Sequence, residues 1–499
     1  MTILAHRPDT VTRDALAVLQ PGFLGTTAPD WLLRQVAEGL TAVGLFGRNI
    51  TSPGQLAALT AQLRAERDDV LVAIDEEGGD VTRLEVRGGS SFPGNLALGA
   101  VDDTALTRDV ARELGRRLAE CGVNLNWAPS ADVNSNPDNP VIGVRSFGAD
   151  THLTARHTAA YVEGLQAAGV AACTKHFPGH GDTNVDSHHA LPRIDADLET
   201  LYARELVPFK AAMDAGTKSI MSAHILLPSL DPTRPATLSP QILTGLLREE
   251  LGYQGLIVTD GMEMNAIAGT YGIERGSVLA IAAGADAICV GGGLADEGTV
   301  LRLRDALVAA VREGHLPEER LADAAARVRS LAEWTRQARV AAAPGAPQEG
   351  SAPGTAGIGL TAARRAVLVS GDRKPVTSAY VATFAPVANI AVGDETPWGP
   401  AAELAELVPD TESARFDESV DPAAVLAAAG PRTIVAVVRD AHRHPWMTAA
   451  LDALVAARPD TVVIEMGLPR AEPRGALYIA THGASRVCGR AAAEIVAGA

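Results

Sequence analysis

The chain has 499 residues, of which 47% are hydrophobic and 21% are charged, a balance that excludes a disordered or fibrous protein. The net charge is −17 and no block of lysine and arginine is present, which argues against a nucleic acid as the partner. The four cysteines are scattered without a CxxC pair, which argues against a disulfide framework and against a zinc ribbon.

The amino-terminal segment carries charged side chains, among them Arg7 and Asp9, and lacks the apolar stretch and small-residue cleavage site of a secretion signal. No run of the chain has the length and hydrophobicity of a membrane-spanning helix. We therefore expect a cytoplasmic protein with no membrane segment, and we predict a monomer.

Over the first 340 residues, short apolar runs alternate with longer segments of helical periodicity, which predicts strands separated by amphipathic helices. About eight such units in about 300 residues are typical of a (β/α)8 barrel, in which helices shield a closed parallel sheet. The predicted strands are 16–23, 42–46, 70–74, 123–126, 170–174, 219–222, 256–259 and 285–290, and the predicted helices include 53–69, 104–121, 152–168 and 198–216.

Polar residues follow five of the predicted strands at the point where each strand ends. A barrel binds its ligand at the carboxyl ends of its strands, so these residues are expected to meet at one mouth. A doubly wound open sheet is the alternative, and it would gather such residues at one switch point from fewer strands. The residues are Asp75, Asp132, Lys175 with His176, His224 and Asp260.

A second, smaller domain is predicted after a segment rich in proline, glycine and alanine, which has almost no large side chain to bury. The predicted boundaries are 1–340 for the barrel, 341–360 for the linker and 361–499 for an α/β sandwich with strands at 366–370, 390–392, 433–438 and 461–466. No Gly-rich phosphate loop is visible there, and we interpret His442 and His444 as part of a solvated loop.

Residues 175–188 (KHFPGHGDTNVDSH) are the most informative stretch of the chain, because turn-forming residues there surround imidazoles, carboxylates and a lysine. Asp186 stands two residues before His188 and can fix the tautomer of that imidazole, which would make it a proton donor and acceptor. Asp260 ends an apolar strand and could support an oxocarbenium-like centre. Each also has an ordinary interpretation, as a polar surface pair and as a turn residue.

Together with other motifs, this stretch resembles the β-N-acetylglucosaminidases of glycoside hydrolase family 3, a group that recycles bacterial cell-wall fragments. The resemblance covers residues 16–334 and, more loosely, the two-domain layout of the Gram-positive members. The further motifs are 75–79 (DEEGG) with Arg83, 92–95 (FPGN), 136–140 (NPDNP), 145–148 (RSFG) and 259–262 (TDGM).

The resemblance implies a role for each matched residue. Asp260 matches the nucleophile of a glycosyl-enzyme intermediate, and His188, paired with Asp186, matches the acid/base. The implied substrate-binding residues are Asp75, Arg83, Arg145, Lys175, His176 and Met262. The implied reaction is the release, with retention of configuration, of terminal β-linked N-acetylglucosamine from peptidoglycan fragments or chitooligosaccharides, without a cofactor or metal.

Some residues depart from the pattern or have no assigned role. Many members carry arginine after the double glycine, and Asp80 here would remove a positive charge near the mouth and leave the preference for anionic leaving groups open. His180 is interpreted as a support of its loop. Asp182 and His189 have no assigned role.

Three other functions stay open from the sequence. A phosphorylase of the same family would use phosphate in place of water, which a histidine acid/base allows because it does not repel a phosphate dianion. A non-catalytic sugar-binding protein would keep the barrel and lose turnover. A metallohydrolase would use a cluster of ligand-type residues to hold zinc, namely His176, His180, Asp182, Asp186, His188 and His189.

Overall fold

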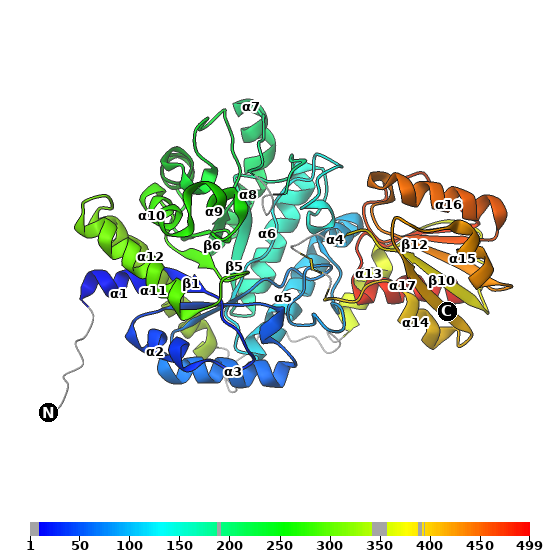
Figure 1. The fold of residues 1–499 in the computed structure, drawn as a ribbon, viewed down its shortest axis with the longest axis horizontal. Helices are drawn as coiled ribbons and strands as arrows, with labels where there is room; N and C mark the ends of the chain where they lie inside the picture. Colours follow the sequence, from blue (N-terminus) through cyan, green and yellow to red (C-terminus); the bar gives the residue numbers. More distant parts are fainter. Residues whose placement is uncertain (1–8, 187–190, 342–356, 388–391, 394) are drawn as a thin grey trace.

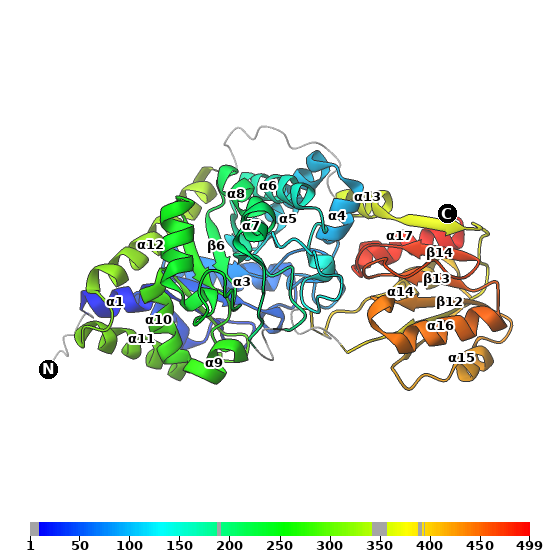
Figure 2. The same ribbon diagram turned by 90° about the horizontal axis from the view of Figure 1, so that it is seen from above.

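The computed structural model describes residues 9–186, 191–341, 357–387, 392–393 and 395–499. Figures 1 and 2 show two adjacent parts, a larger one built from the amino-terminal two thirds of the chain and a smaller one built from the rest. Among the described helices, none combines the length and the hydrophobicity that a bilayer-spanning segment needs.

The larger part is a barrel of parallel strands, as the sequence predicts. Strands β2 to β7 form one sheet in chain order, and β8 pairs with β1. A bridge between Val258 and Ala287 links β7 to β8, and β1 packs beside β2. The strands are β1 (Leu19–Pro21), β2 (Ala42–Leu45), β3 (Leu71–Ile74), β4 (Leu125–Asn126), β5 (Ala171–Phe177), β6 (Ser219–Ser222), β7 (Leu256–Thr259) and β8 (Ile288–Val290).

Several of the longer helices between these strands, among them α3, α5, α6 and α11, begin at a capping side chain. The carboxylates of Asp103 and Asp150 accept the N–H groups of Leu106 and Leu153. The helices are α1 (Thr10–Ala17), α2 (Asp30–Glu38), α3 (Pro53–Glu66), α4 (Asn95–Val101), α5 (Thr104–Glu120), α6 (Thr151–Ala167), α7 (Leu198–Thr200), α8 (Leu206–Asp214), α9 (Asn265–Tyr271), α10 (Ile273–Ala283), α11 (Glu297–Arg312) and α12 (Glu318–Ala341), with π-helical segments at Leu201–Glu205 and Gln241–Glu250.

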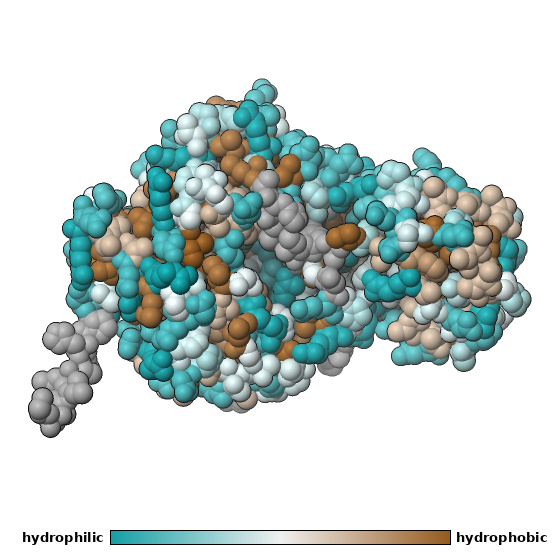
Figure 3. Space-filling model, in the orientation of Figure 1, coloured by the Kyte–Doolittle hydropathy of each residue, from teal (hydrophilic) through white to brown (hydrophobic). Residues whose placement is uncertain are grey.

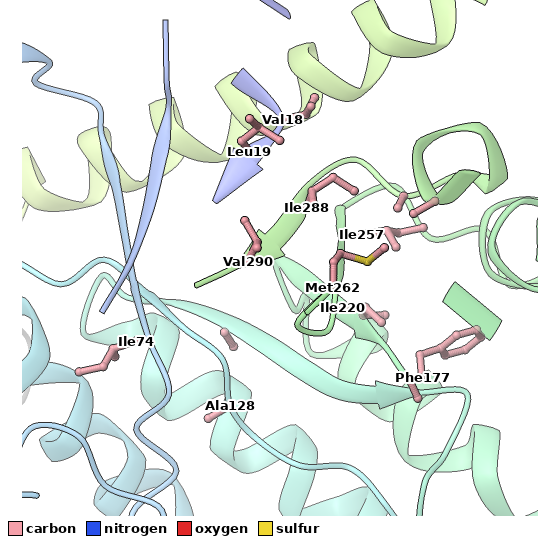
Figure 4. Close-up of a cluster of buried hydrophobic side chains, with 14 of the residues drawn as sticks. Val18, Leu19, Ile74, Ala128, Phe177, Ile220, Ile257, Met262, Ile288 and Val290 are labelled. Carbon is pink, nitrogen blue, oxygen red and sulfur yellow. The ribbon is translucent and has the colours of Figure 1, made fainter. Parts of the chain in front are cut away.

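Alternate residues of most barrel strands belong to two different hydrophobic clusters, because successive side chains of a strand point to opposite faces. In β7, Ile257 packs in the large cluster that faces the helices, part of which is shown in Figure 4. Its neighbours Leu256 and Val258 pack in a smaller cluster inside the barrel. Side chains of α12, among them Val328 and Leu331, join this inner cluster. The helix therefore closes the end of the barrel opposite the mouth.

The smaller part is a six-stranded sheet between two helical layers, in the order β11-β10-β12-β13-β14-β9, with only β9 antiparallel. Helices α13, α14 and α17 cover one face, and α15 and α16 cover the other. The elements are α13 (Ile358–Ala366), β9 (Leu368–Gly371), β10 (Ala379–Phe384), α14 (Ala401–Leu407), β11 (Thr411–Phe416), α15 (Pro422–Ala429), β12 (Thr433–Val438), α16 (Pro445–Ala457), β13 (Val462–Glu465), β14 (Leu477–Ala480) and α17 (Arg486–Ala497).

This domain confirms the predicted α/β sandwich but differs in its strands. Runs 433–438 and 461–466 correspond to β12 and β13, and run 366–370 overlaps β9. The predicted strand at 390–392 falls largely on residues outside the described ones. The sequence interpretation missed β10, β11 and β14; β11 is an edge strand with mostly polar, exposed side chains, so it has no apolar run to reveal it.

The two domains meet where the carboxyl ends of both sheets face each other. After β12, Arg439 forms an ion pair with Asp80, which follows β3 of the barrel. After β14, the N–H of Ala484 donates to the same carboxylate at 2.7 Å. His442 was expected in a solvated loop, but its Nε2 donates to the carbonyl oxygen of Pro137 at 3.1 Å. The second domain thus holds two loops of the barrel mouth.

Candidate active site

A cavity of about 750 Å³ opens at the carboxyl ends of the barrel strands and extends to the second domain. We distinguish two groups among its lining residues. The inner wall consists of Asp75, Arg83, Arg145, Lys175, His176, His180 and Asp260, and the outer wall consists of Phe46, Arg48, Glu263, Gly292, Val392 and Glu395. Of the residues predicted to bind substrate, all but Met262 therefore lie together in the inner wall.

A buried ion-pair network forms the base of the inner wall. The ammonium of Lys175 lies 2.5 Å from Asp75 Oδ1 and 2.7 Å from Glu77 Oε1. The guanidinium of Arg145 binds both carboxylate oxygens of Glu77, at 2.7 Å from Nη2 and 3.0 Å from Nε. Arg83 reaches Asp75 Oδ2 at 3.5 Å. These charge-assisted bonds fix the positions of the side chains before any ligand arrives.

The charges of this network keep one another ionised despite burial. Burial alone would raise the pKa of Glu77, but the positive charges of Arg145 and Lys175 outweigh it and hold that pKa well below the usual range. Burial would likewise lower the pKa of Lys175, but Asp75 and Glu77 raise it. The network thus presents fixed donors and acceptors of the kind that sugar hydroxyl groups bind.

His176 is oriented by a buried carboxylate. Asp132 Oδ2 lies 2.7 Å from His176 Nδ1, and Asp132 Oδ1 accepts the backbone N–H of His180 at 2.7 Å. Burial would raise the pKa of Asp132, but the facing histidines outweigh it and lower the pKa. Because an ionised carboxylate only accepts, Nδ1 of His176 must be the donor. Its Nε2 lies 3.5 Å from Nη2 of Arg145, which ties the ring to the ion-pair network.

His180 is nearly fully buried in the cavity wall, and neither of its ring nitrogens has a hydrogen-bond partner within the described residues. Burial, with the nearby His176, lowers the pKa of His180 to about 4. The ring is therefore neutral at neutral pH and offers one donor and one acceptor. Sequence analysis gave His180 only a supporting role, but the structure places its ring in the wall of the cavity.

Asp260 follows β7 and lines the cavity opposite the ion-pair network. Its backbone is fixed on two sides. Its N–H donates to the carbonyl oxygen of Ser222 at 3.2 Å, and the carbonyl of the next residue, Gly261, accepts from Nε2 of the buried His224 at 3.0 Å. His224, which follows β6, thus supports the turn that carries the carboxylate.

The loop after β5 is held by close packing as far as Asp182. Gly181 lies so near the backbone of Val133 that a Cβ there would approach its carbonyl oxygen to 1.7 Å. Asn139 donates to the carbonyl oxygens of His180 and Gly181 at 2.9 and 3.0 Å. Asp182, which had no role from the sequence, forms an ion pair with Arg204 at 2.7 Å.

The structure places the remaining predicted residues elsewhere. Met262 is fully buried in the core between barrel and helices (Figure 4) and is not among the residues that line the cavity. Asp80 does not line the cavity either, because it binds the second domain. Asp186 lies in the described part of its loop, whereas His188 and His189 lie outside the described residues. The roles of Asp186 and His188 stay predictions.

The candidate zinc ligands do not form a site in the described part of the chain. No group of three or more His, Cys, Asp or Glu side chains there is placed to hold a metal ion. His176 is already bound to Asp132, and Asp182 is bound to Arg204. His188 and His189 are outside this statement.

Sequence reasoning missed several residues of the site. Glu77 was quoted within the DEEGG motif without a role, although it anchors both Arg145 and Lys175. Its adjacency to Asp75 was the available signal, because paired carboxylates after a strand call for paired cations. Arg48, Glu263 and Glu395 carried no motif at all.

Comparison with known proteins gives consistent matches. Residues 29–331 match the model of the glycosyl hydrolase family 3 N-terminal domain. The chain is 36% identical over 332 residues to β-hexosaminidase A of Pseudoalteromonas piscicida, covering 61% of this chain and 55% of that protein. It is 35% identical to a β-hexosaminidase of Neisseria meningitidis serogroup C, covering 52% of this chain and 73% of the relative.

The fold of both domains also has a solved counterpart. A glycoside hydrolase family 3 β-N-acetylglucosaminidase from Paenibacillus sp. strain FPU-7 superposes with a TM-score of 0.86 at 33% identity, covering 98% of this chain and 97% of that one. The chain spans little more than half of the Pseudoalteromonas relative but nearly all of the Paenibacillus structure. The barrel followed by a sandwich is thus shared over its full extent.

Proposed function

Because the chain belongs to glycosyl hydrolase family 3, we propose that it is a retaining β-N-acetylhexosaminidase that removes terminal β-linked N-acetylglucosamine from an oligosaccharide. The observation that carries the proposal is the position of Asp260. Its carboxylate shares the cavity with the ion-paired Asp75, Arg145 and Lys175, so a sugar bound by that network has a carboxylate beside it.

The reaction needs two displacements at the anomeric carbon. In the first, a carboxylate oxygen of Asp260 forms an ester bond with C1 while the glycosidic C–O bond breaks and the leaving oxygen takes a proton. In the second, water attacks C1, its proton is removed, and the ester bond breaks. Two inversions at one carbon retain the β configuration. We assign the proton transfers to His188, with Asp186 as its partner, on the strength of the sequence resemblance.

The inner wall performs the binding. Asp75 can accept hydrogen bonds from neighbouring hydroxyl groups, while Arg83, Arg145 and Lys175 lie where they can donate to the hydroxyl oxygens. His176 lines the same wall, with its Nε2 3.5 Å from Nη2 of Arg145. Glu77 keeps Arg145 and Lys175 aligned from below. Since these groups are ordered in advance, the sugar loses little binding free energy to rearrangement of the protein.

Peptidoglycan fragments and chitooligosaccharides are the two substrate classes that this proposal admits, and peptidoglycan turnover is the corresponding process for the first. The cytoplasmic location and the monomeric state are predictions that rest on the sequence alone.

A trapping experiment tests the assignment of Asp260. Incubation with a slow fluorinated N-acetylglucosamine donor, followed by peptide mapping, is expected to place the covalent sugar on Asp260. Asp260→Asn is expected to lose about 10⁴-fold or more in kcat/KM on a chromogenic β-N-acetylglucosaminide, whereas the exposed Asp305→Asn stays within about twofold of the unaltered chain. A label on any other residue would overturn the mechanism.

The same assays separate hydrolysis from phosphorolysis and test the acid/base. With millimolar phosphate, hydrolysis yields free β-N-acetylglucosamine, whereas a phosphorylase would yield the sugar 1-phosphate. His188→Ala is expected to lose about 10²-fold or more on a leaving group that needs protonation and far less on a dinitrophenyl leaving group, which does not. Equal losses on both leaving groups would remove His188 from the acid/base role.

A further inference from the structure

The cavity continues past the inner wall and is completed by the second domain. Arg48 and Phe46 follow β2, Glu263 follows β7, and Glu395 comes from the segment after β10. A single sugar held by the inner wall leaves this outer wall to whatever is attached to C1. The following argument rests on the proposed function, because it concerns the leaving group of that reaction.

The outer wall holds an aromatic ring in a fixed position. The ring of Phe46 lies with its centroid 6.3 Å from that of Trp127, and the guanidinium of Arg48 lies 4.5 Å from the Phe46 centroid. A Cβ on Gly22 would come within 2.9 Å of Phe46 Cε2, and a Cβ on Gly44 would come within 2.8 Å of Trp127 Cη2, so glycine at these positions leaves room for the two rings. A fixed ring beside charged groups is suited to a second sugar, which has both C–H faces and polar edges.

The charges of the outer wall do not cancel. Arg48 donates to the carbonyl oxygens of Phe23 at 3.1 Å and Gly292 at 2.9 Å, so backbone groups already occupy much of its guanidinium. Burial lowers the pKa of Arg48, while the carboxylates of Glu263 and Glu395 oppose that shift. One guanidinium against two carboxylates leaves this wall with a net charge of about −1.

The two carboxylates are held differently. Glu263 Oε1 accepts the backbone N–H groups of Gly291 and Gly293 at 2.9 and 3.3 Å, so the barrel fixes it. Glu395 is exposed and belongs to the second domain, and its Oε2 lies 3.1 Å from the position that a Cβ on Gly47 would take. The second domain therefore contributes the carboxylate that makes the net charge of the outer wall negative.

We propose that the outer wall is the leaving-group subsite, that it takes a neutral or ammonium-bearing hexosamine, and that Glu395 makes it discriminate against leaving groups with a carboxylate. A leaving group with a carboxylate would meet Glu263 and Glu395, and the cation of the described outer wall, Arg48, is already bound to backbone carbonyl oxygens. An ammonium group would be attracted by both. The preferred substrates are then chitin-type oligosaccharides, including partly deacetylated ones, rather than muramic acid derivatives.

Four disaccharides test the role of charge, and the acid and its methyl ester test it at matched bulk. Each carries the same terminal β-1,4-linked N-acetylglucosamine, on glucosamine, on N-acetylglucosamine, on N-acetylmuramic acid or on the methyl ester of that acid, which keeps the bulk and removes the charge. The unaltered chain is expected to cleave the ester about 3- to 10-fold better than the acid in kcat/KM, and the glucosamine compound at least as well as the neutral one. High salt should shrink both differences.

Two variants test whether Glu395 of the second domain causes the preference for the ester over the acid. Glu395→Gln is expected to bring the ratio of ester to acid close to one, because the charge that separates the two leaving groups is removed. Glu418→Gln, which changes an exposed glutamate of the same domain away from the cavity, should leave every ratio as it is. An unchanged ratio in Glu395→Gln, or a preference of the unaltered chain for the acid, would overturn the inference alone. No release of N-acetylglucosamine from any donor would contradict the proposed function, and this inference with it.

Discussion

The two sheets of this protein turn the carboxyl ends of their parallel strands toward the same junction, but they use those ends differently. In the barrel, residues at the carboxyl ends of β3, β5 and β7 surround a cavity with paired charges; Lys175 and His176 lie in the last residues of β5 itself. In the second domain, the residues after β12 and β14 bind barrel loops, through Arg439 and the N–H of Ala484. Parallel sheets commonly bind ligands at this edge. Here the edge of the barrel lines the candidate active site, and the edge of the second sheet holds the loops around that site.

The difference teaches what each edge requires of its residues. The barrel edge needs a set of charges that are satisfied before a substrate binds, and Glu77 provides this by binding both Arg145 and Lys175. The second edge needs only contacts at a few well-placed points. One of them, Asp80, is three residues after Glu77 in the same loop. The two edges are therefore connected through a single short segment.

The largest expected effect comes from breaking the barrel edge at Glu77. Glu77→Gln keeps the shape of the side chain but leaves the buried Arg145 and Lys175 without their shared anion. We expect kcat/KM on a chromogenic β-N-acetylglucosaminide to fall by about 10²-fold or more and the free energy of unfolding to fall by roughly 3–5 kcal/mol. Steady-state kinetics and urea unfolding measure the two.

A matched control separates binding from stability. Glu113 is also buried, and it binds Arg116 and Arg117 on α5, away from the cavity. Glu113→Gln should lower stability while leaving kcat/KM within about twofold. If both variants lost activity in proportion to stability, Glu77 would be a structural residue and not part of the binding network.

A smaller effect is expected from breaking the junction at Asp80. Asp80→Asn can still accept the N–H of Ala484, but Arg439 loses its ionic partner. We expect a loss of about 1–3 kcal/mol in stability and of about 10-fold in kcat/KM, because the loop that positions Glu77 is released on one side. Calorimetry and kinetics on the full chain measure these changes.

The junction offers its own control. Asp103 and Arg365 also form an ion pair between the domains, at 2.9 Å, but both side chains are partly exposed to solvent. Asp103→Asn keeps the cap of α5 and should change kcat/KM by less than about twofold. Equal effects of the two substitutions would mean that the position of the Asp80 loop does not matter to the site.

Near the barrel edge, one buried carboxyl group is expected to make the stability of the protein depend on pH. Glu205 lies beneath the loop after β5, where its Oε2 would be 2.6 Å from a Cβ on Gly179. Burial raises the pKa of Glu205 to about 7, although Arg204 opposes the shift. In the unfolded chain this carboxyl group ionises near its usual pKa of about 4.3.

The direction in which stability changes with pH depends on which state, folded or unfolded, holds the proton of Glu205. Between about pH 4.5 and 7 the folded chain keeps the proton of Glu205 and the unfolded chain has lost it, so this group's contribution to stability falls as pH rises. Glu205→Gln removes that dependence. From pH 5.5 to pH 8 the variant should therefore gain about 2 kcal/mol relative to the unaltered chain, as measured by urea unfolding. A constant difference would show that Glu205 ionises normally in the folded protein.

Much of the barrel edge could be predicted from sequence because its signals are local. Each strand is an apolar run followed at once by a polar residue, so Asp75, Lys175 and Asp260 stand out, and a parallel barrel brings such residues together. The roles that local signals could not give depend on distant partners. Glu77 gains its role from Arg145, which is 68 residues away.

The contacts that the second domain makes with the barrel could not be predicted from the sequence, for a physical reason. Arg439, Ala484 and Glu395 have ordinary local surroundings, and only the docking of two domains gives them a role. The sequence gives equally little indication of their partners in the barrel. From the sequence, Asp80 was noted only because it replaces an arginine of the family, whereas in the structure it forms an ion pair with Arg439. Met262 was carried over from a motif, but its place in the strand–turn pattern directs it into the core.

Because α12 closes the end of the barrel opposite the mouth, the routes by which ligands can enter and leave the cavity are restricted. Trp127, Met221 and Cys289 line the cavity and also pack in the interior cluster that α12 completes. Within the described residues, this leaves the opening at the outer wall as the route for reactants and products. In the proposed reaction, the departing alcohol has to clear that opening before water can reach C1, and the monosaccharide leaves last. A second sugar that lingers there can take the place of water, so the ratio of elongated to hydrolysed product should rise with acceptor concentration.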